Sequence, residues 1–406
     1  MVSLKEIGDF LGAAVMSCIR CRSCIWSDLP DLLPICPSYE KYGFYAFSAS
    51  GKISLVKALV FGSINYDESL ADVFYKCTLC GACQENCGIF GKKLVGKEYL
   101  EKGWLNITDI IQFIREQLIE RGIIFPEHKA LLVNTLKFGN PFASKKERLK
   151  WIEGLDFKIK NLGRESAKIL FYPGCMYSFE PTVRETAKIF VRILEKAKVD
   201  FGILGEEEVC CGHLQLQIGE RGLFQELAEK NIKMLNNLGI EKLVTPCPHC
   251  YYTIKKLYPK VAGINFQVQH FAEFLNQLVE DGKLKPTKIL NATITYSDPC
   301  NLARFVRIIQ EPRNILSNIS GAELREMPRS REQAWCCGAG GGVMAAFPDL
   351  MKSTAEERIN EAKSTGSSIM ATACPWCEYS LKTIAEAEDE SSIKILNMAE
   401  VFWQTL

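Results

Sequence analysis

The heptapeptide 336-CCGAGGG-342 sets two cysteines side by side and follows them with four glycines among the next five residues. A second adjacent pair opens the stretch 210-CCGH-213, which lies 126 residues upstream. Neighbouring side chains on extended backbone diverge, so two adjacent sulfurs fit poorly on one compact cube of metal and sulfide. They could instead straddle an opened cluster, with one sulfur bridging two metal atoms. Two such pairs in one chain indicate a duplicated metal site.

The pairs belong to an internal duplication that covers roughly residues 169 to 406. Each half carries a single cysteine, the adjacent pair and a C-x-x-C motif, and equivalent cysteines are 125 to 127 residues apart. The stretch 270-HFAEFL-275 also recurs, as 397-NMAEVF-402. The ten cysteines are Cys175, Cys210, Cys211, Cys247 and Cys250 in the first half, and Cys300, Cys336, Cys337, Cys374 and Cys377 in the second. A cubane cluster takes one thiolate for each of its four irons, so each half has one cysteine more than a cubane needs.

Each half is predicted to be an α/β unit. Apolar strands at 169–172, 242–245, 292–297 and 368–373 run directly into cysteine-bearing turns, and amphipathic helices are predicted at 183–198 and 223–238. The cysteines should therefore gather at the carboxyl ends of strands, where an open α/β sheet forms its crevice. In both C-x-x-C motifs a proline, Pro248 or Pro375, occupies the expected first turn of a helix, whose N-terminus lowers the pKa of nearby thiols.

Glycines follow both pairs. Without a Cβ, Gly212, Gly338, Gly340 and Gly341 would let the backbone pass close to a cluster and donate N–H groups to it. The alternative interpretation of the second glycine run is a flexible linker.

The N-terminal cysteines form a different system. The stretch 18-CIRCRSC-24 is followed by a Cys36-Pro37 pair, and 77-CTLCGACQENC-87 comes later. Three thiolates at three-residue intervals can wrap one 4Fe-4S cubane that a distant fourth cysteine completes. The usual crossed pattern assigns Cys18, Cys21, Cys24 and Cys87 to one cluster, and Cys77, Cys80, Cys83 and Cys36 to the other. Two features depart from the ferredoxin pattern: eleven residues separate Cys24 from Cys36, and Gly88 replaces the usual proline.

The region before the duplication is predicted to be an all-helical ferredoxin-type domain. A helix is expected at 109–122, with Gly122 ending it, while 53–61 fits a strand or a helix equally well. The domain boundaries are predicted at 1–160, 161–289 and 290–406. No glycine motif for nucleotide binding is present, so any flavin or nicotinamide would be carried by a partner.

Charge and composition limit the partners. The 406 residues include 49 basic and 48 acidic side chains, which gives no electrostatic footprint for nucleic acid. The density of 18 cysteines favours metal ligation in a reducing compartment over disulfides. No apolar run is long enough to span a bilayer, and the first residues lack the pattern of a leader. We expect a cytoplasmic protein, whose attachment to the inner face of a membrane would come through a partner subunit.

The double pattern of cysteine, CCG and C-x-x-C, preceded by two cubane motifs, resembles the fused catalytic subunit of heterodisulfide reductase. The resemblance is specific at the cysteines, includes 140-NPF-142 and covers nearly the whole chain. It implies two noncubane 4Fe-4S clusters, one for each CCG motif, in addition to the two cubanes. It also implies the mixed disulfide of coenzyme M and coenzyme B as substrate, and a multi-subunit complex with a cytochrome b-type membrane protein or a flavoprotein as electron donor.

Reduction of a disulfide takes two electrons, whereas each cluster delivers one. We therefore expect the substrate S–S bond to lie between the two CCG clusters. The cubane clusters would transfer electrons from the donor to these two clusters. The two product thiols also need protons. His213 and His249 lie beside first-half ligands where the second half has Ala339 and Trp376, which suggests a wetter half-site with proton donors and a more apolar one. Either imidazole could instead only hydrogen-bond a cluster sulfur or a carbonyl. His128 and His270 are expected to be structural.

Three alternatives stay open. The chain could be a pure electron-transfer subunit between a flavin-bearing 2-hydroxy-acid oxidase and quinone, with no substrate at the CCG motifs. It could also be a zinc-binding scaffold, because zinc uses C-x-x-C pairs as well. The basic stretch 143–154, with Lys145, Lys146, Arg148 and Lys150, could meet an anionic substrate or acidic partner, or be only a solvated helix face.

Overall fold

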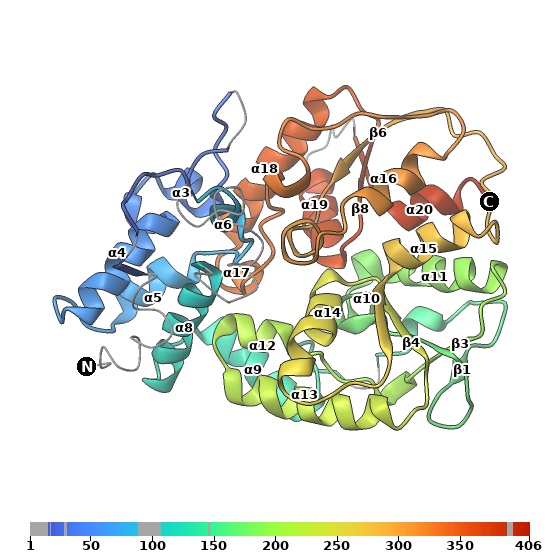
Figure 1. The fold of residues 1–406 in the computed structure, drawn as a ribbon, viewed down its shortest axis with the longest axis horizontal. Coiled ribbons are helices and arrows are strands. Elements are labelled where there is room, and N and C mark those ends of the chain that lie inside the picture. The colour runs from blue at the N-terminus through green and yellow to red at the C-terminus, as the bar shows by residue number, and fades with distance from the viewer. Residues whose placement is uncertain (1–14, 17, 28–30, 88–106, 145–146, 388–392) are drawn as a thin grey trace. The chain divides into compact units, whose positions relative to one another are not determined.

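The chain forms two compact units. The computed structural model describes residues 15–16, 18–27, 31–87, 107–144, 147–387 and 393–406 (Figure 1). The first unit comprises Met1–Lys129, Leu214–Arg221 and Pro328–Arg358, and the second comprises Ala130–His213, Gly222–Met327 and Ile359–Leu406. Two segments of the duplicated region, one of which contains the second CCG motif, therefore belong to the same unit as the N-terminal cysteines. The boundaries expected at 160 and 289 stay predictions.

The described part of the first unit is built from helices, as predicted. Its N-terminal elements are α3 (Pro37–Tyr42), η1 (Tyr45–Phe47), α4 (Ala49–Val60), α5 (Glu68–Tyr75), α6 (Ala82–Glu85) and α8 (Ile107–Glu120). The ambiguous stretch 53–61 lies in α4, and α8 ends before Gly122, which adopts a left-handed φ of 76°. The helix α9 (Pro126–Phe138) runs from the first unit into the second. The inserted segments add most of α12 (His213–Ile218), η7 (Arg331–Gln333), α17 (Val343–Ala346) and the first part of α18 (Pro348–Ser364).

The second unit contains two parallel sheets. The first has the strand order β1 (Lys160–Asn161), β3 (Phe201–Ile203), β2 (Ile169–Phe171), β4 (Lys242–Thr245), β5 (Gln267–His270). The second has the order β7 (Ala322–Leu324), β6 (Ala292–Ser297), β8 (Ile369–Thr372), β9 (Lys394–Asn397). Residues Ile169, Leu170 and Phe171 of β2 pair with Lys242, Leu243 and Val244 of β4, and β6 pairs with β8 in the same way from Ile294↔Ile369 onward. The predicted α/β class and the four predicted strands are confirmed.

Helices connect the strands of both sheets. Those of the first repeat are α10 (Gly174–Phe179), α11 (Pro181–Lys196), α13 (Arg221–Asn236), α14 (Pro248–Tyr252) and α15 (Phe271–Glu280), together with the 3-10 helices η3 (Gly205–Glu207) and η5 (Tyr258–Lys260) and the π-helix η4 (Thr253–Leu257). Those of the second are η6 (Asn301–Val306), α16 (Gln310–Ser317), α19 (Pro375–Ala387) and α20 (Met398–Trp403), while η2 (Lys150–Ile152) precedes both. As predicted, Pro248 begins α14 and Pro375 begins α19.

The repeated HFAEFL and NMAEVF motifs are equivalent helix starts. His270 and Asn397 are the N-caps of α15 and α20, and in each case a glutamate three residues later, Glu273 or Glu400, completes a capping box. The sequence similarity between the repeats therefore reflects a shared local fold at these positions.

A buried polar network joins the two repeats inside the second unit. Glu378 of α19 is fully buried and accepts hydrogen bonds from Tyr177 of α10 at 3.2 Å and Thr186 of α11 at 2.5 Å. Lys382 forms an ion pair with Glu378 at 2.7 Å. This network fixes α19, whose first turn carries a C-x-x-C cysteine, against helices of the first repeat. Among the helices in the described ranges, none is both long and apolar enough to cross a membrane.

Candidate iron-sulfur site

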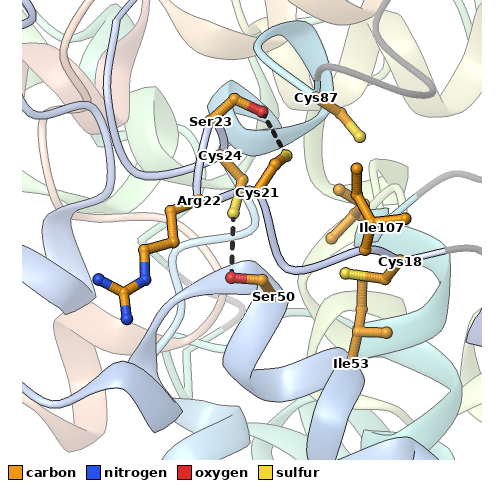
Figure 2. Close-up of a pocket in the computed structure, with 10 residues that line it drawn as sticks. Cys18, Cys21, Arg22, Ser23, Cys24, Ser50, Ile53, Cys87 and Ile107 are labelled. Atoms are coloured by element: carbon orange, nitrogen blue, oxygen red, sulfur yellow. Dashed lines mark hydrogen bonds between the residues drawn. The ribbon is translucent and has the colours of Figure 1, made fainter.

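The N-terminal cysteines line two pockets within the first unit. Cys18, Cys21, Cys24 and Cys87 share one pocket with Ile53 of α4 and Ile107 of α8 (Figure 2). Cys36 shares the other with Cys77, Cys80 and Cys83. Each pocket thus combines three closely spaced cysteines with one distant cysteine. This is the crossed grouping that the spacing led us to expect.

The two cysteine turns have the same unusual backbone. The residue before the second cysteine, Arg20 or Leu79, is left-handed, with φ of 59° and 52°. The residue after it, Arg22 or Gly81, is left-handed too, with φ of 66° and 76°. Alternation of this kind turns successive N–H groups toward one side, which forms a concave nest for an anion. Three of these four residues are not glycine, and such strain persists only where the surroundings over-determine it.

Burial raises the pKa values of several of these thiols. Desolvation is the main cause that raises the pKa of Cys36 to about 12, and it also raises the pKa values of Cys24 and Cys83. Thiolates in such places need positive charge beside them, and metal binding supplies it as the proton leaves. The four-thiol sets and the nests therefore fit anionic 4Fe-4S clusters.

The five cysteines of the first CCG repeat converge at one end of their sheet. Cys175 follows β2, Cys210 and Cys211 follow β3, and Cys247 and Cys250 flank the start of α14 after β4. Their thiols form a continuous series of contacts in the order Cys175, Cys210, Cys211, Cys250, Cys247. The strand order places these turns where β2 lies between β3 and β4, the switch point at which such sheets bind ligands.

Glycines shape this thiol cluster. Gly174 is left-handed, and a Cβ on it would lie 2.9 Å from the Cys250 sulfur. Gly212 is also left-handed, and its N–H donates to the Cys210 sulfur at 3.5 Å. Gly338 repeats this contact with Cys336 at 3.4 Å. The sequence analysis did not single out Gly174, although its place directly before a cluster cysteine was a usable signal.

Gly340 and Gly341 lie elsewhere than expected. Within the first unit, a Cβ on Gly341 would clash with the carbonyl oxygen of Cys77, and one on Gly340 would lie 2.7 Å from that of Thr78. These two glycines therefore allow the second CCG loop to lie against the backbone of an N-terminal cysteine turn. The close approach required by these glycines rules out the interpretation of this run as a linker.

The cysteines of the second repeat are divided between the units. Cys336 and Cys337 belong to the first unit, whereas Cys300, Cys374 and Cys377 belong to the second. In the second unit, Cys300 caps η6 after β6, and Cys374 and Cys377 follow β8 at the start of α19. These three occupy the positions that Cys175, Cys247 and Cys250 occupy in the first repeat.

The two C-x-x-C turns meet at equivalent residues. His249, between Cys247 and Cys250, lies against Trp376, between Cys374 and Cys377, with ring centroids 5.6 Å apart. Tyr177 lies within electrostatic range of both Cys247 and Cys374. Within the second unit, the C-x-x-C turns of the two repeats therefore meet at one aromatic contact.

The histidines are more buried than the sequence suggested. His213 and His249 stack with centroids 4.5 Å apart and are 5% and 8% exposed, so the expectation of a wetter first half-site is wrong. The Nδ1 atom of His213 lies 2.9 Å from the Thr253 hydroxyl, and its Nε2 is buried with no protein partner in the described structure. Burial and the neighbouring His249 lower the pKa of His213 well below its usual value, so its ring is neutral at pH 7. A neutral ring protonated at Nε2 would accept the Thr253 proton at Nδ1 and keep a donor for a ligand.

Arg148 is a site residue whose role the sequence analysis missed. It was placed in a basic run, of which Lys145 and Lys146 lie outside the described residues. Arg148 is buried, pairs with Glu208 at 2.6 Å and lies 3.9 Å from the Cys175 sulfur. Burial raises the pKa of Glu208 to about 7, although the charge of Arg148 and its hydrogen bond oppose this shift. The solvated-face interpretation is therefore wrong for Arg148.

Comparison with known proteins identifies the family. The model of a cysteine-rich domain called CCG matches residues 169–255 and 294–382, and a 4Fe-4S dicluster domain matches residues 14–89. The D-type subunit of dihydromethanophenazine:CoB–CoM heterodisulfide reductase from Methanosarcina barkeri is 32% identical over 96% of this chain and 93% of its own length. The chain belongs to the family of D-type heterodisulfide reductase subunits. It is therefore an iron-sulfur oxidoreductase subunit, and the sequence resemblance is confirmed.

Two further similar proteins have different names. EtfAB:quinone oxidoreductase of Syntrophomonas wolfei is 33% identical over 85% of the chain, which spans only 48% of that protein. A crystal structure of a hypothetical protein from Helicobacter pylori has a TM-score of 0.56 over 88% of this chain and 67% of its own, at 12% identity, which shows a shared fold only.

Proposed function

We propose that this member of the family reduces a disulfide to two thiols, with the mixed disulfide of coenzyme M and coenzyme B as the substrate type. The reaction consumes two electrons and two protons for each S–S bond. The observation that carries the proposal is the contact of His249 with Trp376, because it brings the C-x-x-C turns of both repeats together. A disulfide lying at this contact could have one sulfur near each set of thiols.

The grouping of the cysteines supports a proposal for the cofactors. We propose cubane 4Fe-4S clusters in the two N-terminal pockets, and noncubane 4Fe-4S clusters on the five cysteines of each repeat. When bound, these clusters supply one-electron transfer. For the first repeat the five contacting thiols support the assignment; for the second it rests on the sequence duplication.

Several residues of the chain would serve the reaction directly. The buried Nε2 of His213, two residues after Cys211, would donate a hydrogen bond to a product sulfur, with Thr253 holding the ring. Arg148 would stabilise the thiolate of Cys175. His249 and Trp376 would exclude water from the S–S bond, which protects partly reduced sulfur from side reactions.

The partners follow from the same scheme. Electrons would come from a cytochrome b-type membrane protein or a flavoprotein, in a complex at the cytoplasmic face of a membrane.

The second candidate function is electron transfer to quinone without a disulfide substrate, which the name of EtfAB:quinone oxidoreductase favours. Its test is the same experiment with a different acceptor.

The experiment uses the full chain, purified without oxygen and reduced by a viologen dye. Our proposal predicts that the coenzyme M–coenzyme B disulfide reoxidises the chain with two thiols released for every two electrons. Reoxidation by a quinone analogue, with none by the disulfide, would support the second candidate and refute ours. Zinc in place of iron and sulfide would refute both.

A further inference from the structure

The first unit contains a buried arginine whose charge is not balanced by any acidic residue in the described part of the chain. Arg115 of α8 is 0% exposed. Its guanidinium donates hydrogen bonds to five backbone carbonyls, those of Phe74, Tyr75, Cys77, Gln217 and Gly341. Among the residues that the structure describes, no aspartate or glutamate forms an ion pair with it; the neighbouring Glu116 is paired with Arg221 at 2.7 Å. An unpaired buried charge is costly, so an uncompensated cation at this position calls for a functional explanation.

The carbonyls that bind Arg115 come from three segments of the first unit, one of which lines the pocket of Cys36, Cys77, Cys80 and Cys83. Cys77, whose carbonyl oxygen is 2.6 Å from Nη2, is a cysteine of that pocket. Gly341, whose carbonyl oxygen is 2.8 Å from Nη1, belongs to the second CCG loop. Gln217 accepts the N–H of Gly341 at its side-chain oxygen, 3.0 Å away, so the same segment holds the loop from its other side.

We propose that Arg115 is an electrostatic positioning residue: its charge raises the reduction potential of the cluster held by Cys36, Cys77, Cys80 and Cys83, and its hydrogen bonds fix the second CCG loop beside that cluster. Uptake of one electron makes a cluster and its four thiolates one charge more negative, which a nearby buried cation favours. The inference rests on the proposed cubane and adds the route by which electrons reach the second CCG motif. The electron-donor protein of the complex would supply that electron.

The test is a potentiometric titration of the full chain, followed by electron paramagnetic resonance, with iron content measured on every sample. Arg115→Gln should shift one cluster to a more negative potential, and the Cys77→Ser variant identifies which signal belongs to that cluster. Gln217→Glu is a second variant in case the first does not fold. It keeps an acceptor for Gly341 but gives Arg115 a counter-charge, and it should shift the same signal in the same direction.

The matched control is Arg221→Gln in the same unit. Its side chain is 67% exposed and already paired with a carboxylate, so the potential should not move. Unchanged potentials in an iron-replete Arg115→Gln or Gln217→Glu protein would overturn the inference, as would an equal shift in Arg221→Gln. If the wild-type chain lacks a cubane signal altogether, the proposed cofactor assignment fails, and the inference about Arg115 fails with it. If the wild-type signal is present but the Arg115→Gln potential is unchanged, only the inference about Arg115 fails.

Discussion

Replacing Gly174 by alanine tests whether the first CCG repeat is built around a cluster. The new Cβ would lie 2.9 Å from the Cys250 sulfur and 3.8 Å from the Cys247 Cβ, on a residue whose φ is 77°. The left-handed backbone costs an alanine about 1–2 kcal/mol. Displacing Cys250 adds about 1–3 kcal/mol, typical of overpacking. The second contribution falls on Cys250, a proposed ligand, so we expect the loss of one of the proposed clusters, ~4 of ~16 irons.

Gly239→Ala is the matched control. Gly239 also has a left-handed φ, 65°, but a Cβ there would have nothing within 4 Å. It should lose only the backbone contribution of about 1–2 kcal/mol and keep all of its iron. Iron and sulfide analysis, together with urea unfolding of both variants, measures the difference. Full iron content in Gly174→Ala, or equal loss in the control, would refute the assignment of Cys250 as a ligand.

Three further predictions concern the second unit. Trp376→Ala should keep the iron but slow disulfide-dependent reoxidation by up to roughly tenfold, because an aromatic pair is worth about 0.5–1.5 kcal/mol; Trp376→Phe should retain most of the rate, and equal rates in all three proteins would contradict this. Removing one partner of the buried Arg148–Glu208 pair, as Arg148→Met or Glu208→Gln, should cost about 3–5 kcal/mol in urea unfolding, and the double variant should lose less than the sum of the two; additive losses would show that the pair is not coupled. Burial lowers the pKa of His270 to about 3 from its ordinary value of about 6.5. Between pH 6.5 and pH 3, therefore, the imidazole of His270 is protonated in the unfolded chain but stays neutral in the folded chain. The contribution of His270 to the free energy of unfolding is complete above pH 6.5 and falls, by on the order of 4 kcal/mol, as the pH drops toward 3. His270→Asn, which copies the Asn397 cap, should remove this pH-dependent contribution. A free energy of unfolding that depends on pH as steeply in the variant as in the wild type would exclude His270 as its source.

Periodicity and spacing predicted the features that depend on neighbouring residues. The strand at 169–172 and the proline at the start of α14 are set by local pattern, and the helix of 107–120 ends where Gly122 permits a left-handed turn. The grouping of Cys36 with the Cys77 turn followed from a known ligand pattern, not from local propensity. The strands β1, β3, β5, β7 and β9 were not predicted, because the predicted strands were recognised as apolar runs that lead directly into cysteine-bearing turns, and these five strands do not lead directly into such a turn.

The features that were missed depend on contacts between distant segments. Arg148 sits in a stretch that looks like an exposed basic face, yet it is buried through Glu208, which is 60 residues away. Arg115 occupies an ordinary helical position in the sequence, and only its contacts with Cys77 and Gly341 reveal its place beside a cysteine turn. Neither the hydrophobic pattern nor the spacing of charges records such partners.

Anomalous diffraction from oxygen-free crystals, recorded on both sides of the iron absorption edge, tests the central claim most directly. We predict iron in the two N-terminal pockets and at both C-x-x-C turns, with one group of iron atoms on each side of the rings of His249 and Trp376. Iron confined to the N-terminal pockets, or a signal only at the zinc edge, would contradict the account.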